Sequence, residues 1–241
     1  MKFVRGGLQM TTIRDCIAPD RNPKVPSIKL PKGSIDTHVH IFESQYPLFE
    51  GRGYNPPDST LDDLKHLHTQ LGVSRVVYTQ PSPYGVDNSA ILKGMKVMNN
   101  ETPGRARGVC AIKMDVSDSF LEDLDKQGIK GVRLNMDNIG GMPIGLDEIP
   151  TLEARIKDLG WHVEYLFPGK DIVELAPIFK KSSVPISIAH FAYQPATNGI
   201  NSEGFKTLLD LVRDGNTWIK ISGANRVSET DLPPYDDVMP M

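Results

Sequence analysis

Residues 35–42 read Ile35-Asp36-Thr37-His38-Val39-His40-Ile41-Phe42, a mostly apolar run that carries two histidines two positions apart. β-Branched and aromatic residues in such a run favour a strand. Side chains alternate between the faces of a strand, so His38 and His40 point to the same side. One buried histidine is commonly a core residue with a polar partner, but two on one face both need partners in an apolar interior. The pair is therefore predicted to be functional.

The chain after this run repeats one pattern, in which a short apolar strand is followed by a loop and an amphipathic helix. Strands are expected to begin near residues 35, 74, 108, 131, 161, 185 and 217, with helices over 61–71, 88–99, 117–127, 146–159, 171–181 and 203–213. Helical crossovers make the strands parallel, which leaves a barrel or a doubly wound sheet. Polar residues of catalytic type follow the strand ends, where a barrel has its active site. The predicted fold class is α/β, as a (β/α)8 TIM barrel.

Two regions are expected from the distribution of proline and of the strand pattern. Residues 1–34 carry four prolines among polar residues and are predicted to form an N-terminal Pro-rich surface arm. Residues 35–241 are predicted to form the barrel domain. Only about twenty residues follow the seventh strand, which is too few for another βα unit. The domain is therefore expected to be C-terminally incomplete, with about seven strands present.

The composition is that of a folded protein, with 39% hydrophobic and 24% charged residues. A net charge of -3 gives no indication of nucleic acid or of an anionic membrane as a partner. No run reaches the ~18 apolar residues of a membrane span, and no apolar stretch follows the charged start as in a secretory signal. Two cysteines, Cys16 and Cys110, predict no disulfide framework and a cytoplasmic location. A small-molecule partner is expected, and a homo-oligomer is left open.

Further polar residues are predicted to meet the histidine pair at the strand ends. His190 ends the sixth strand, so three imidazoles are candidates for catalysis, either as a metal site or as a neutral set that polarises a carbonyl. Arg133 and Arg226 are candidates for docking a substrate carboxylate, although each alone fits a structural salt bridge equally well. Ser82, just past the second strand, is a candidate for holding a substrate oxygen, with a plain turn residue as the alternative.

A metal is not expected, but the alternative stays open. A binuclear site of the kind found in hydrolases of this architecture needs a lysine on the fourth strand, where this chain has Arg133, which cannot lose its proton and ligate. A single divalent ion such as zinc would use His38, His40 and His190, with Glu164 as the available carboxylate. His66 and His68 diverge around their helix and are expected at the surface. Residues 43–59 are expected to form either a lid or a surface excursion.

The motifs together resemble the amidohydrolase superfamily, and within it the branch of 2-pyrone-4,6-dicarboxylate lactonase-like hydrolases. The likeness is carried by the His-Val-His strand with Asp36, Gln80-Pro81-Ser82, Gly131-Val132-Arg133-Leu134-Asn135, Gly160-Trp161-His162-Val163, Ile188-Ala189-His190 and Trp218-Ile219-Lys220 with Arg226. The resemblance implies a distorted barrel in which His38, His40 and His190 polarise a lactone carbonyl, often without a metal. It also implies that Arg133, Arg226 and the Ser82 turn hold substrate carboxylates and the carbonyl.

The chain departs from that branch at three places. The branch has an aspartate on an eighth strand as general base, and this chain ends before that position. Leu166 stands where the lactonase type has a tyrosine, and Tyr193 where it has an arginine. The predicted function is a hydrolase that opens the lactone of a small carboxylated metabolite by water attack, with reduced activity. The alternatives are an impaired barrel that only binds a small acid or a partner chain, and a metal-dependent decarboxylase or hydrolase of the same superfamily.

Overall fold

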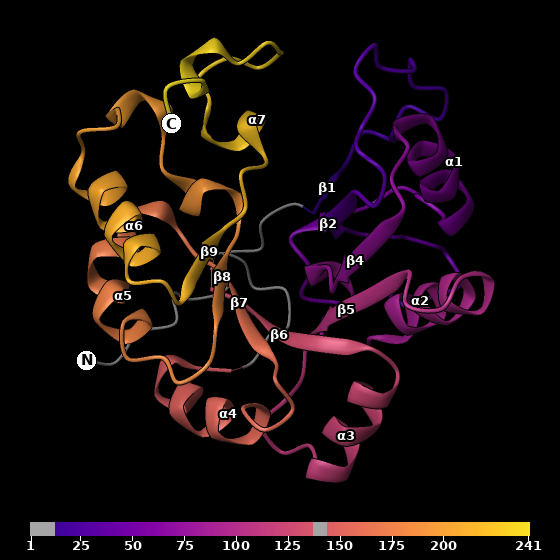
Figure 1. Cartoon of the computed structure of the whole chain (residues 1–241), viewed down its shortest axis with the longest axis horizontal. Coiled ribbons are helices and arrows are strands. Elements are labelled where there is room, and N and C mark those ends of the chain that lie inside the picture. Colours follow the sequence, from indigo (N-terminus) through magenta and orange to yellow (C-terminus); the bar gives the residue numbers. More distant parts are fainter. Residues whose placement is uncertain (1–12, 137–143) are drawn as a thin grey trace.

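The structure is a computed structural model that describes residues 13–136 and 144–241. Seven strands form one parallel sheet in chain order, with β2 and β9 at its edges (Figure 1). The strands are β2 (Ile35–Val39), β4 (Arg75–Thr79), β5 (Ala106–Cys110), β6 (Ile129–Asn135), β7 (His162–Leu166), β8 (Ile186–Ile188) and β9 (Thr217–Ile219). The helices on the outside are α1 (Leu61–Leu71), α2 (Ser89–Glu101), α3 (Asp118–Lys126), α4 (Ile149–Ile156), α5 (Ile172–Phe179) and α6 (Glu203–Arg213), and the short α7 (Ala224–Val227) follows β9. The predicted α/β class with seven parallel strands is confirmed.

The sheet is curled as in a TIM barrel, with its helices outside (Figure 1). Lys220, one residue past β9, donates from Nζ to the carbonyl oxygen of Thr37 in β2 at 3.1 Å. One lysine side chain therefore spans from one edge of the sheet to the other. This curvature brings the ends of strands that are far apart in sequence into one interior.

Local sequence signals explain where the helices begin and end. Thr60 caps α1 in a reciprocal capping box with Asp63, and Gly72 ends the helix with a left-handed backbone. Ser202 caps α6 with its side chain alone, since its hydroxyl accepts from the amide of Phe205. The apolar faces of these helices pack on the sheet in one continuous core. No helix in the described ranges is long and apolar enough to cross a membrane.

A second, two-stranded sheet joins the N-terminal arm to the loop after β2. β1 (Arg14–Asp15) pairs in parallel with β3 (Tyr54–Asn55). The side chain of Asn55 also donates to Asp15 Oδ1 at 2.9 Å. The first twelve residues of the predicted arm lie outside the described residues. The arm and residues 43–59 are therefore held to each other beside the main sheet.

The surface position expected for His68 is wrong, whereas His66 is exposed as expected. His68 is 1% exposed, and its Nε2 lies 3.2 Å from Asp36 Oδ2. It lies four residues after buried Leu64, so the helical period places both on the face that packs on β2. The other oxygen of Asp36 accepts from the amide of His38 at 3.2 Å. His68 thus supports the strand that carries the first site histidine.

Candidate active site

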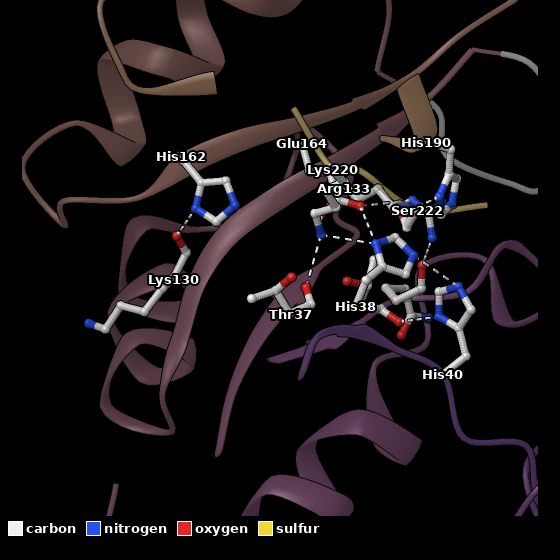
Figure 2. A network of polar contacts seen from close by, with 12 residues as sticks. Thr37, His38, His40, Lys130, Arg133, His162, Glu164, His190, Lys220 and Ser222 are labelled. Carbon is white, nitrogen blue, oxygen red and sulfur yellow. Dashed lines mark hydrogen bonds and ion pairs between the residues drawn. The ribbon is translucent and has the colours of Figure 1, made fainter. Parts of the chain in front are cut away.

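A β-bulge in β2 sets the positions of the two strand histidines. Asp36 pairs with Val76 and Val39 with Tyr78, so three steps on β2 match two on β4. Both imidazoles nevertheless point into the barrel interior, with their Nε2 atoms 3.3 Å apart (Figure 2). This distance agrees with the prediction from the sequence that both side chains point to the same side.

The direction of each hydrogen bond through this pair follows from its neighbours. Lys220 Nζ lies 2.9 Å from His38 Nδ1, and an ammonium group only donates. His38 therefore carries its hydrogen on Nε2 and donates it to His40 Nε2. His40 in turn donates from Nδ1 to the carbonyl oxygen of Thr79 at 2.7 Å. Both rings are neutral in this arrangement, with opposite tautomers.

A buried ion pair lies against His38 (Figure 2). Glu164 is fully buried, and its Oε2 accepts from Lys220 Nζ at 2.5 Å. Its Oε1 lies 3.6 Å from both His38 Nδ1 and Arg133 Nε and makes no hydrogen bond. Burial raises the pKa of Glu164, but the charges of Lys220 and Arg133 outweigh it and hold that pKa below the usual value. Glu164 is therefore an ionised carboxylate in the interior.

His190 joins the strand pair from the end of β8. Its ring centre lies 4.9 Å from that of His38, and its Nδ1 lies 2.9 Å from Ser222 Oγ. His190 begins a turn of four residues that all have left-handed φ near 50°, an uncommon conformation for residues other than glycine. Gly223 packs so closely on the ring that an added Cβ would lie 3.1 Å from His190 Nδ1. Close approach of this loop therefore requires glycine at position 223.

All three imidazoles resist protonation. Burial, and then the charge of Arg133, lowers the pKa of His40 to about 3, and the same causes in the same order lower that of His190 to about 4. Burial, the neighbouring His40 and then Lys220 hold the pKa of His38 well below its usual value. Near neutral pH the cluster therefore consists of uncharged hydrogen-bond donors and acceptors beside fixed cations.

The predicted substrate-binding residues lie at different depths. Arg133 is 4% exposed and donates to the carbonyl oxygen of Gln80 at 2.9 Å. Ser82 is buried in the short 3₁₀ turn Ser82–Tyr84. Arg226 is exposed on α7 and lines a cavity of about 760 Å³. Burial raises the pKa of Tyr54, and the charges of Arg133 and, more weakly, Arg226 oppose that shift.

A family model described as amidohydrolase matches residues 35–239. The chain belongs to the amidohydrolase family. The match spans all seven strands of the curled sheet and the histidines and arginines described above.

Named relatives of this amidohydrolase act on lactones. The chain is 33% identical to 2-pyrone-4,6-dicarboxylate hydrolase of Comamonas testosteroni in an alignment of 229 residues that covers 91% of this chain and 74% of the relative. It is 32% identical to 4-sulfomuconolactone hydrolase of Hydrogenophaga intermedia, covering 94% of this chain and 74% of that one. A solved relative is a probable 2-pyrone-4,6-dicarboxylic acid hydrolase from Acinetobacter baumannii with citric acid bound, at 28% identity and a TM-score of 0.73, covering 86% and 75% of the two chains.

The hydrogen-bond directions in this amidohydrolase do not fit the zinc alternative. Two imidazoles bind one metal through Nε2 only if both Nε2 atoms offer lone pairs. His40 meets this condition, because its hydrogen is on Nδ1. His38 does not, because its Nδ1 faces the ammonium of Lys220 and its hydrogen is on Nε2. In residues 13–136 and 144–241, no group of three or more His, Cys, Asp or Glu side chains is arranged to hold a metal ion.

Sequence reasoning did not assign Lys220, Ser222 or Tyr54 to the site. Lys220 was visible only as part of a motif, although a lysine directly after a strand of a parallel barrel is at the functional rim. Glu164 was expected only as the carboxylate base or ligand of a metal site, whereas in the structure it pairs with Lys220. Tyr54 comes from the long loop, where no periodicity indicates which side chain turns inward.

Proposed function

We propose that this amidohydrolase opens the ring of a small carboxylated lactone by attack of water on the ring carbonyl. The observation that carries the proposal is the cluster of three neutral imidazoles at the strand ends, 3.3 Å apart at the His38 and His40 Nε2 atoms, in a chain related to two lactone hydrolases. Uncharged N–H donors in a buried site stabilise charge that develops on a carbonyl oxygen.

His38 is the donor to the lactone carbonyl oxygen in this proposal. Its Nε2–H points to His40 in the free protein, and the carbonyl oxygen replaces His40 as the acceptor. The Nε2 lone pair of His40 is then released to accept a proton from the attacking water. The bond from water oxygen to carbonyl carbon forms, the ring C–O bond breaks, and the proton passes to the departing ring oxygen. The product is an open-chain hydroxy acid.

Glu164 is not the proton acceptor in this scheme. Its Oε2 is bound to Lys220, and its Oε1 is close to Nδ1 of His38, on the ring edge opposite Nε2. With a pKa of about 3, His40 is a weak base. A well-placed base of matched pKa typically contributes ~10²–10⁴-fold. We therefore expect slow turnover whose rate rises with pH as hydroxide takes over from water.

The acidic groups of the substrate are assigned to the arginines. Arg226 lines the cavity of about 760 Å³ together with Arg14, and Arg133 lies deeper, beside the imidazoles. Guanidinium groups match carboxylates in geometry and charge. The Acinetobacter relative has citric acid, a polycarboxylate, bound, which is consistent with an acidic substrate for this chain. We place Ser82 and Tyr54 on the wall that receives the ring.

We further propose that the reaction needs no metal and takes place in the cytoplasm. The tautomer of His38 supports the first part, since it offers a hydrogen where a metal needs a lone pair. Two free thiols, Cys16 and Cys110, support the second part.

The test is hydrolysis of a panel of lactones with and without chelator. We expect turnover of a dicarboxylated pyrone or a muconolactone that survives chelation. His190→Asn and Arg133→Met should lower kcat/KM at least tenfold, whereas the exposed controls His66→Asn and Arg213→Met should not. Turnover that chelation abolishes would overturn the metal-free reaction, and unchanged rates in both site variants would remove the site.

A further inference from the structure

The lactone-opening scheme uses neither member of the buried ion pair between Lys220 and Glu164. Both side chains are almost fully removed from solvent, at 13% and 0% exposure. Burying two charges is costly unless their geometry and remaining hydrogen bonds are good. A pair in such a place, in contact with a proposed catalytic imidazole, calls for a role beyond stability.

Lys220 has a hydrogen-bond acceptor for each of its three hydrogens. Nζ lies 2.5 Å from Glu164 Oε2, 2.9 Å from His38 Nδ1 and 3.1 Å from the carbonyl oxygen of Thr37. A lysine ammonium has three donors and no acceptor. His38 can therefore meet Lys220 only with the lone pair of Nδ1, and its hydrogen must be on Nε2.

The rest of the chain of hydrogen bonds agrees with this direction. His38 Nε2–H faces the Nε2 lone pair of His40 at 3.3 Å, and His40 keeps its own hydrogen on Nδ1 for the carbonyl oxygen of Thr79. Reversing His38 would set its Nδ1–H against the lysine and leave two lone pairs facing each other between the rings. Only one direction satisfies every contact.

Glu164 is the counter-ion that holds this lysine in place. Its carboxylate is held between Lys220 and Arg133, 3.6 Å from the Nε of the arginine. If Lys220 is removed, the nearest donor left to Glu164 Oε1 besides the arginine is Nδ1 of His38, also at 3.6 Å. The carboxylate would then favour the opposite tautomer, with the hydrogen of His38 on Nδ1.

We propose that Lys220 is a positioning residue that sets the direction of the hydrogen bonds through His38 and His40, so that His38 presents Nε2–H to the substrate. The catalytic consequence rests on the proposed lactone hydrolysis, in which the carbonyl oxygen accepts this hydrogen. The tautomer itself is a property of the free protein. A second consequence is that Lys220 keeps His38 and His40 from acting together as metal ligands.

The direct test is ¹⁵N NMR of the histidine side chains at pH 7 in the substrate-free protein. In the wild type, the shift of His38 Nδ1 is expected to be that of an unprotonated nitrogen and Nε2 that of a protonated one. In Lys220→Met the two are expected to exchange. Lys126→Met, which removes a solvent-exposed lysine, should leave the His38 signals unchanged. A wild-type Nδ1 that carries the hydrogen would overturn the proposal without any variant, and so would an unchanged tautomer in folded Lys220→Met.

A second variant covers the case in which Lys220→Met does not fold because Glu164 loses its partner. Lys220 lines a cavity of about 550 Å³, which can admit a small amine. Lys220→Ala is prepared with ethylammonium, which supplies the missing cation, and its spectrum should match that of the wild type. Removal of the amine should shift the hydrogen of His38 to Nδ1, and an amine-independent tautomer would contradict the proposal.

Kinetics separate the catalytic consequence from a merely structural role. Loss of one preoriented donor to a developing oxyanion lowers kcat by ~10²–10³-fold. Lys220→Met should show a loss of this size in kcat with KM changed less than about threefold, because the arginines that dock the acid remain. It should also bind Zn²⁺ more tightly than the wild type. If the tautomer behaves as expected but no lactone is turned over, the proposed function fails while the role of Lys220 stands.

Discussion

The Nε2 atoms of His38 and His40 lie 3.3 Å apart, and the hydrogen between them belongs to His38. This distance suits two ligands of a tetrahedral metal as well as a hydrogen bond between rings, so distance alone does not decide the chemistry. Lys220 lies at the opposite edge of the His38 ring and donates a hydrogen bond to the Nδ1 lone pair. This contact favours the hydrogen bond between the rings over a shared metal. The site therefore offers an N–H donor to a carbonyl oxygen.

Activity is expected to persist well below the usual pKa of histidine. Burial and Arg133 lower the pKa of His40 to about 3 and that of His190 to about 4. The neutral, active forms are thus retained as pH falls through 6.5. The acidic limb of the kcat/KM profile should lie near pH 4, after correction for the unfolded fraction. An inflection near 6.5 that moves with His190→Asn would contradict this assignment.

Stability is expected to fall on acidification because of the same histidines. In the unfolded chain each titrates near pH 6.5, whereas in the folded chain it stays neutral to about 3–4. The unfolded state therefore binds more protons between these values, so stability is constant above pH 6.5 and decreases below it. At pH 5 the loss should be about 1–2 kcal/mol per histidine. Urea unfolding at pH 7 and pH 5 measures it, and His40→Asn should reduce the difference, whereas His66→Asn should not.

Removal of the Glu164 charge should destabilise the protein strongly. Glu164→Leu leaves Lys220 buried without its counter-ion, and breaking a buried pair costs about 3–5 kcal/mol. The double variant Lys220→Met with Glu164→Leu should recover most of that loss. Asp123→Asn, which breaks the exposed pair with Lys126, should cost at most about 1 kcal/mol. Chemical denaturation of the wild type and these three variants is the measurement, and equal losses in Glu164→Leu and Asp123→Asn would contradict a buried ion pair.

Two glycines with similar left-handed backbones separate the effect of backbone strain from that of side-chain contact. Gly223 has φ 67° and ψ 39° and would place a Cβ 3.1 Å from His190 Nδ1, whereas Gly72 has φ 75° and ψ 25° and open space around it. Alanine at either position should cost about 1 kcal/mol of stability, because both backbones are left-handed. Only Gly223→Ala should lower kcat, since it displaces the imidazole. Equal kinetics in the two variants would show that the position of His190 does not matter.

The sequence predicts the elements well because their signals are local. The period of apolar residues and the caps at Thr60 and Gly72 define α1 to the residue, and α6 agrees in the same way. The spacing of two residues between His38 and His40 correctly indicates that their side chains lie on one side and meet. Their catalytic role, and those of His190, Ser82, Arg133 and Arg226, stay predictions.

The contacts that set the direction of the hydrogen bonds in the site join residues that are far apart in the sequence. Lys220 and His38 are 182 residues apart, and they meet only because the sheet curls until its first and last strands approach. The burial of His68 was missed because it depends on which helix face packs on β2. The inward turn of Tyr54 depends on a loop held by the N-terminal arm. Such features depend on contacts between segments that are far apart in the sequence. Local propensity and periodicity do not predict these contacts.

The central claim is that an uncharged His38 donates a hydrogen bond to a lactone carbonyl without a metal. The most direct measurement is kcat for 2-pyrone-4,6-dicarboxylate with chelator-treated wild type and with His38→Asn. We expect measurable turnover by the treated wild type and a loss of ~10²-fold or more in the variant. No hydrolysis by the treated wild type, restored by added zinc, would contradict it, and so would a variant as active as the wild type.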